Sequence, residues 1–199
     1  MKPNLLILAG LGDSGENHWQ SYWLKKYSNS SKVIQDNWNE PKLENWIEKL
    51  NEAILKLDAP TILVAHSLAV SMVMHWASAN TNPNIVGALL VAPADVDSPE
   101  HAPEVIWNFA PIPTIPLDFP STVISSENDP YISLERAKYL AEKWEQTEVK
   151  PEMLDSTAKH EMIHVLIANL ACLVGVGYLS EDEAIKAEES LVVKLCKLL

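Results

Sequence analysis

Short apolar runs alternate along this chain with longer segments in which apolar side chains recur every three or four residues. The longer segments predict helices at Lys42–Leu57, about Leu68–Ser78 and about Ser133–Trp144. Because strands that alternate with helices pair in parallel and are covered on both faces, we expect a three-layer α/β sandwich. The runs that predict its six strands are Leu5–Ala9, Val33–Gln35, Thr61–Ala65, Val86–Ala92, Thr122–Ser125 and Glu148–Leu154.

The remaining segments add loops and a helical tail to this plan. Pro111–Pro120 holds four prolines and predicts an extended loop. Ser180–Leu199 opens with SEDE, a capping box, and predicts an amphipathic helix. The 199 residues show no repeat and no low-complexity linker, so we expect one domain over residues 1–199.

Charge and hydropathy narrow the classes of partner. The formal net charge is −12 and no run of Lys and Arg stands out, so nucleic acid and anionic membrane surfaces are poor partners. The apolar segment Met162–Leu179 is interrupted by His164, Asn169 and two glycines. A transmembrane helix needs about 20 mostly apolar residues, so we expect a buried or interface helix and no membrane span.

Cysteines and histidines suggest a reducing compartment and no metal. Cys172 and Cys196 lack CxxC spacing, so we expect buried free thiols and a cytoplasmic protein. The N-terminal apolar run is too short for a signal peptide, since a charged residue follows at Asp13. The six histidines show no metal-binding spacing. We therefore expect no cofactor.

One serine lies where a buried strand is predicted to end and a helix to begin. Ala65-His66-Ser67-Leu68-Ala69 has small residues two before and two after the serine, as a nucleophile on a sharp strand–helix turn requires. The N-terminus of the following helix would face a developing oxyanion, and the Leu68 N–H is the expected donor. The alternative is that Ser67 only caps the helix.

A nucleophilic serine needs a base and an acid that orients the base. Asp129 follows the fifth predicted strand, where such an acid would lie, although the position taken alone favours a plain Asx turn before Pro130. Asp95 and Asp97, after the fourth strand, are the rival acids.

The candidate bases follow the sixth predicted strand. His160 lies near the end of a polar loop, whereas His164 is embedded among apolar residues whose burial would disfavour an imidazolium. We therefore prefer His160. Of the other histidines, we expect His75 to pack in a helix, His101 to be solvated and His66 to shape the pocket.

Several stretches together resemble a known family. They are GLGDSGENHWQSYW, QDNWNEP, VAHSLAVSMVMHWA, LLVAPADVDSP, FPSTVISSENDPYISLERAKYLAEKW and the loop around His160, and they span Leu5 to about His160. The sequence resembles the small serine-hydrolase family of the α/β-hydrolase superfamily, which includes the retinoblastoma-binding serine hydrolase and bacterial relatives. The resemblance implies a strand order of 2-1-3-4-5-6 and the roles of nucleophile, acid and base for Ser67, Asp129 and His160. It also implies a second oxyanion donor in the loop after the first strand, which we place at the Leu11 N–H.

The chain departs from the family pattern in three places. Ala69 replaces the glycine that usually ends the serine turn, Lys159 precedes His160, and the last forty residues do not match. We expect a serine hydrolase that cleaves a small ester or amide, with a pocket covered by His18-Trp19 and the stretch Trp107–Pro116. The competing hypothesis is a catalytically weak protein-interaction module that docks a protein partner, or a second copy of the chain, through the apolar C-terminal helix.

Overall fold

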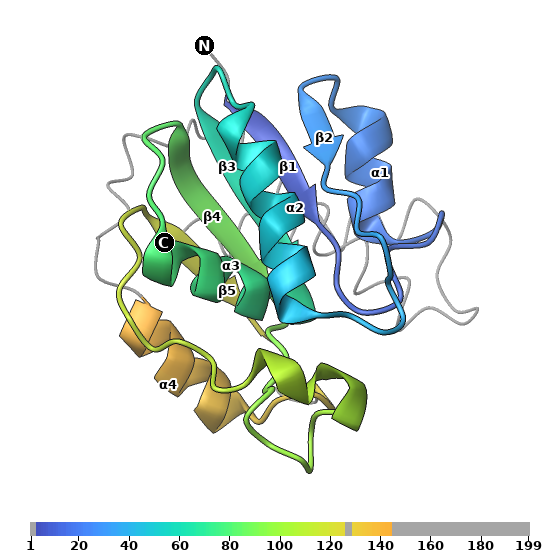
Figure 1. Cartoon of the computed structure of the whole chain (residues 1–199), viewed down its shortest axis with the longest axis vertical. Helices are drawn as coiled ribbons and strands as arrows, with labels where there is room; N and C mark the ends of the chain where they lie inside the picture. Colours follow the sequence, from blue (N-terminus) through green and yellow to red (C-terminus); the bar gives the residue numbers. More distant parts are fainter. Residues whose placement is uncertain (1–2, 126–128, 145–199) are drawn as a thin grey trace, which may run out of the picture. The chain divides into compact units, whose positions relative to one another are not determined.

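The fold is built on a parallel sheet that the computed structural model describes over residues 3–125 and 129–144. These residues belong to one compact unit of the chain, Met1–Glu148. They form a five-stranded sheet in the order β2-β1-β3-β4-β5, in which each pairing is parallel (Figure 1). The strands are β1 (Asn4–Leu8), β2 (Ser30–Lys32), β3 (Thr61–His66), β4 (Ile85–Val91) and β5 (Ser121–Ile124).

The observed order confirms the predicted α/β class and the 2-1-3-4-5 part of the predicted sheet. The sixth predicted strand, Glu148–Leu154, lies outside the described residues, as do Met162–Leu179, Ser180–Leu199 and both cysteines. The extent of the single domain stays a prediction. Among the residues that the structure describes, no helix is long and apolar enough to cross a membrane.

Four α-helices and one 3-10 helix accompany the described strands. The helices α2 (Leu43–Leu55) and α3 (Leu68–Ala79) pack against each other, and α3 also contacts β3 (Figure 1). Eight of the twelve residues of α3 are buried, which explains why its sequence is apolar on nearly every side. The others are α1 (Trp19–Lys26), α4 (Leu134–Trp144) and the 3-10 helix η1 (Glu104–Phe109).

Most predicted elements are confirmed, and two differ. The second strand is Ser30–Lys32 rather than Val33–Gln35. Val33 and Gln35 are buried after the strand has ended, so burial at the following turn resembled a strand in the sequence. The segment Trp19–Lys26, for which no helix was predicted, is the helix α1. The proline-rich segment Pro111–Pro120 is extended, without helix or strand, as predicted.

The register of the strands brings their following loops to one edge of the sheet. Leu8 pairs with Ala65, His66 pairs with Val91, and Val91 pairs with Ile124. The chain therefore leaves β1, β3, β4 and β5 at the same level. Because neighbouring strands lie about 4.8 Å apart, residues that follow β3 and β5 start only about 10 Å from each other.

Candidate active site

Ser67 forms the turn between β3 and α3. Its backbone has φ 55° and ψ −122°, a combination rare for a residue with a side chain. Two backbone hydrogen bonds hold this conformation: the Ser67 N–H donates to the Val91 carbonyl at 2.9 Å, and its carbonyl accepts from the Val70 N–H at 3.0 Å. Although Ser67 occupies the N-cap position, its side chain makes no capping hydrogen bond. The alternative that Ser67 only caps α3 is therefore wrong.

Small residues let the neighbouring segments approach this turn. Ala65 and Ala69, the two small positions of the motif, are fully buried. On the other side lies Gly10, just after β1. A Cβ added to Gly10 would lie 2.9 Å from the His66 carbonyl oxygen and 3.0 Å from the Ser67 Cβ. The loop after β1 thus packs directly on the serine turn.

Some backbone N–H groups in the loop after β1 and at the start of α3 donate hydrogen bonds, and others have no acceptor in the described part of the chain. The Gly12 N–H donates to the Trp38 carbonyl at 2.9 Å, and the Asp13 N–H donates to the Gly10 carbonyl at 3.2 Å. The N–H groups of Leu11 and Leu68, the two predicted oxyanion donors, have no hydrogen-bond acceptor within residues 3–125 and 129–144. An unpaired N–H at the first position of a helix is a suitable donor to an anion.

Three aromatic rings gather beside the serine turn. The His66 ring lies 4.8 Å from the His18 ring and 6.0 Å from the Trp19 ring, measured between centroids. His18 is the N-cap residue of α1, and its Nδ1 accepts a hydrogen bond from the Gln20 N–H at 3.3 Å. The predicted role of His66 in shaping the surroundings of Ser67 is consistent with this packing.

Burial favours the neutral form of both histidines in this cluster. Burial, with a smaller contribution from His18, lowers the pKa of His66 to about 4. Burial and the nearby Lys32 lower the pKa of His18, against a smaller opposing effect of Asp13. An imidazole with a pKa near 4 is a poor proton acceptor at neutral pH. We therefore do not assign the role of base to His66.

The candidate acid Asp129 lies in the turn that follows β5. Its Oδ1 accepts a hydrogen bond from the Tyr131 N–H at 2.9 Å, so the predicted Asx turn is present. Its Oδ2 has no partner in the described part of the chain, which leaves one carboxylate oxygen to accept a hydrogen bond. The carbonyl of the next residue, Pro130, lies 3.2 Å from His101 Nδ1. That histidine, expected to be solvated, thus contacts this turn.

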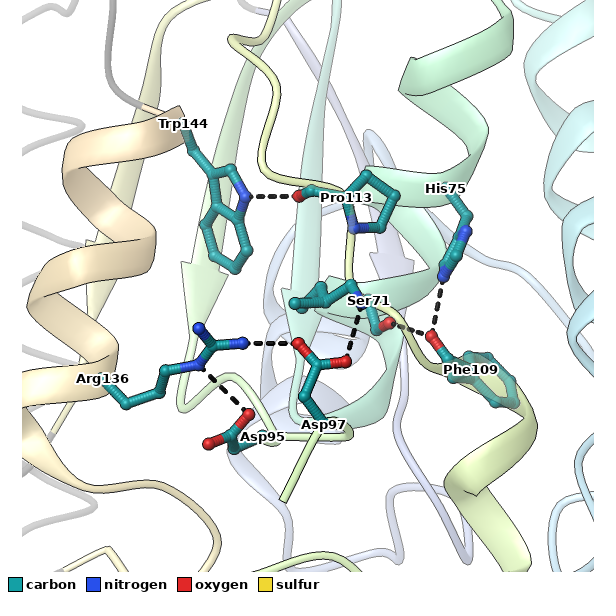
Figure 2. Close-up of polar contacts among 9 residues, drawn as sticks. Ser71, His75, Asp95, Asp97, Phe109, Pro113, Arg136 and Trp144 are labelled. Carbon is teal, nitrogen blue, oxygen red and sulfur yellow. Dashed lines mark hydrogen bonds and ion pairs between the residues drawn. The ribbon is translucent and has the colours of Figure 1, made fainter.

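The rival acids Asp95 and Asp97 are both bound to Arg136 of α4 (Figure 2). Arg136 Nε donates to Asp95 Oδ1 at 3.2 Å, and Arg136 Nη2 donates to Asp97 Oδ2. Asp97 Oδ1 also accepts the Ile112 N–H at 3.0 Å. These contacts tie the loop after β4 to the proline-rich segment and to α4. They favour a structural role for both carboxylates and leave Asp129 as the better candidate.

The neighbouring contacts in Figure 2 join α3 to the end of η1 and α4 to the proline-rich segment. His75 Nε2 lies 2.7 Å from the Phe109 carbonyl oxygen, and Trp144 Nε1 donates to the Pro113 carbonyl at 2.8 Å. The prediction that His75 packs in its helix is confirmed. Trp107, in the stretch expected to cover the pocket, donates its indole N–H to the Ala102 carbonyl and is 42% exposed.

Both candidate bases, His160 and His164, lie outside the described residues, so their assignment stays a prediction. Within the described ranges, no group of three or more His, Cys, Asp or Glu side chains could hold a metal ion.

The sheet is parallel, and Ser67 lies on a sharp turn between a central strand and a buried helix without capping that helix. These features place the protein in the α/β-hydrolase-like class. The chain belongs to the serine hydrolase family, whose model matches residues 5–160. The resemblance inferred from the sequence is confirmed, and the protein is a hydrolase.

Two solved structures are similar to the chain. A putative YdeN-like hydrolase from Pectobacterium atrosepticum is 29% identical, with 74% of this chain and 77% of that chain covered and a TM-score of 0.63. The YdeN gene product from B. subtilis is 21% identical, with 74% and 86% covered and a TM-score of 0.58, a likeness that concerns the fold alone. No curated protein matches the chain.

Sequence reasoning missed two residues that shape this region. Gly10, which no sequence motif singled out, packs on the serine turn. Gln20 is fully buried in the polar stretch Asn17-His18-Trp19-Gln20 and bonds to two strands. That stretch contributed to the family resemblance, but no spacing rule indicated what its glutamine contacts.

Proposed function

We propose that the protein hydrolyses a small ester or amide through an acyl-enzyme formed on Ser67. The observation that carries the proposal is the turn itself. Ser67 is held at φ 55° with a side chain that makes no capping hydrogen bond. It lies beside two backbone N–H groups, at the same edge of the sheet, that find no acceptor among the described residues. A strained serine on a sharp turn at a helix N-terminus is suited to nucleophilic attack.

The proposed reaction uses a serine nucleophile, a histidine base, an aspartate and two backbone N–H groups. Ser67 Oγ attacks the acyl carbonyl, and His160 takes the hydroxyl proton. The N–H groups of Leu68 and Leu11 bind the oxyanion of the tetrahedral intermediate. His160 then gives its proton to the leaving alcohol or amine, and water releases the acyl group by the reverse sequence, while Asp129 stabilises the imidazolium.

The surroundings of Ser67 bear on the polarity of the substrate. The neutral rings of His66, His18 and Trp19 offer apolar surface beside the nucleophile. Lys32 lies near this cluster but is paired with Asp13. This environment supports an uncharged substrate.

Hydrolysis of a short-chain p-nitrophenyl ester tests this function. We expect wild-type protein to release a burst of p-nitrophenol equal to the enzyme concentration, because the activated ester acylates the serine quickly and the slower deacylation then limits turnover. Ser67→Ala should show neither burst nor turnover. The matched control is Ser71→Ala, a buried serine of the same helix whose Oγ donates to the Phe109 carbonyl at 3.5 Å. Folded wild-type protein that cleaves neither esters nor amides would contradict the proposal and favour the interaction module.

A further inference from the structure

A glutamine with no exposed surface lies beneath the candidate site. Gln20, the second residue of α1, is 0% exposed, and both ends of its amide are hydrogen-bonded. Its Nε2 donates to the Leu8 carbonyl at 3.0 Å and to the Val64 carbonyl at 3.1 Å. Its Oε1 accepts from Ser14 Oγ at 2.6 Å. One amide therefore joins two strands and a loop.

The groups bound by this amide flank the two parts of the candidate oxyanion hole. Leu8 ends β1 and lies three residues before Leu11, and Ser14 lies three residues after it. Val64 belongs to β3, three residues before Ser67. Gln20 thus holds both ends of the loop that carries the Leu11 N–H and fixes them to the strand that carries the serine.

The loop between these anchors has a backbone that needs support. Gly12 and Asp13 are consecutive residues with positive φ, 76° and 66°. A non-glycine residue in this region is strained, and such conformations persist only where surrounding contacts determine them. The Ser14 carbonyl also accepts the Ser21 hydroxyl at 3.1 Å, so α1 contacts the loop at a second point.

We propose that Gln20 is a positioning residue for the oxyanion hole, which holds the Leu11 N–H at the place where charge develops. The inference rests on the proposed function of Ser67. Loss of one oxyanion donor typically lowers kcat about 10²- to 10³-fold, and a misplacement of about 1 Å can cost about 10²-fold. Since the loop would be displaced rather than removed, we expect a loss of roughly 10- to 100-fold.

The test compares Gln20→Met with Gln35→Met. Gln35 is the matched control, because it is also buried, but its Nε2 contacts only Met72 Sδ at 3.5 Å and its Oε1 has no partner in the described chain. We would measure kcat and KM for a short p-nitrophenyl ester, and the affinity for a trifluoromethyl ketone, which forms a tetrahedral oxyanion adduct on the serine. A thermal melt of each variant measures its stability.

For Gln20→Met we expect kcat and ketone affinity to fall by similar factors while KM stays within about twofold. Gln35→Met should keep wild-type kcat and ketone affinity. Ser14→Ala removes the hydrogen bond from the Ser14 hydroxyl to Gln20 Oε1. If Gln20→Met does not fold, this variant tests whether the amide positions the oxyanion hole. We expect it to lower both quantities by a smaller factor.

Two results would count against the inference. If Gln20→Met melts earlier but keeps wild-type kcat and ketone affinity, Gln20 is only structural. Unchanged kcat and ketone affinity in Ser14→Ala, when Gln20→Met is unfolded, has the same meaning. A wild-type protein that neither turns over ester nor binds the ketone would instead refute the proposed function, so the two failures are distinguishable.

Discussion

The change of Gly10 to alanine tests whether the loop after β1 must pack on the serine turn. The new Cβ would lie 2.9 Å from the His66 carbonyl oxygen and 3.0 Å from the Ser67 Cβ. Ordinary contact begins at 3.4 Å, so the closer approach is short by 0.5 Å. Both obstacles are backbone or Cβ atoms, which have no rotamer to escape into. The loop or the turn must therefore move.

The magnitude follows from that displacement. Overpacking of a close-packed site costs about 1–3 kcal/mol. A shift of about half an ångström between the nucleophile and the oxyanion donors should lower kcat roughly 10-fold, since about 1 Å costs about 10²-fold. We expect Gly10→Ala to fold, to melt several degrees earlier and to cleave a p-nitrophenyl ester about ten times more slowly.

Two other glycines of the same loop supply the controls. A Cβ at Gly15 meets no atom of the described residues within 4 Å, so Gly15→Ala should keep wild-type kcat and stability. A Cβ at Gly12 also meets nothing, but φ is 76°, so Gly12→Ala measures backbone strain of about 1–2 kcal/mol without a clash. If Gly10→Ala matched Gly15→Ala in kcat and melting temperature, the packing argument would be refuted.

Three further predictions concern ionisable side chains. Asp129→Asn should lower kcat by about 10⁴-fold, whereas Asp97→Asn should keep activity and lose about 1–2 kcal/mol of stability, because its contact with Arg136 is weakened. Ester assays and thermal melts of both variants check this prediction. An active Asp129→Asn beside an inactive Asp97→Asn would assign the acid to the loop after β4. His160→Ala should abolish turnover while His164→Ala mainly lowers the melting temperature, and an active His160→Ala beside an inactive, folded His164→Ala would reverse the assignment. The unfolded chain takes up a proton at His66 below the ordinary pKa of 6.5, but the folded chain does so only near 4. Stability should therefore fall as pH drops through this window, by up to about 1.4 kcal/mol per pH unit. His66→Phe should flatten that slope in pH-dependent melts, and an unchanged slope would show that His66 is not its source.

Local patterns were enough to predict the sheet and the position of the serine. Most residues of β3 and of α3 are buried, so both elements are continuous apolar runs in the sequence. Ser67 stands out because it lies at the boundary between these two runs. Helix α2 was predicted from the spacing of its buried residues. In contrast, α1 has only Gln20 and Trp23 buried, so its sequence lacks the apolar period that indicates a helix.

Contacts between residues far apart in the chain could not be predicted from the sequence. The bond of Gln20 to Val64 joins residues 44 positions apart, and the bond of Arg136 to Asp95 joins residues 41 apart. Each depends on the order of strands in the sheet. Asp129 was assigned as the acid from its place after the fifth strand and from the family resemblance, whereas the binding of its rivals Asp95 and Asp97 to Arg136 could not be read from the sequence.

The central claim, that Ser67 is the nucleophile, is tested most directly by covalent labelling. A fluorophosphonate probe reacts with a serine only where a base and an oxyanion hole activate it. We predict one adduct per chain, found by peptide mapping on Ser67, and no adduct in Ser67→Ala. An adduct on another serine, or none on folded wild-type protein, would contradict the account.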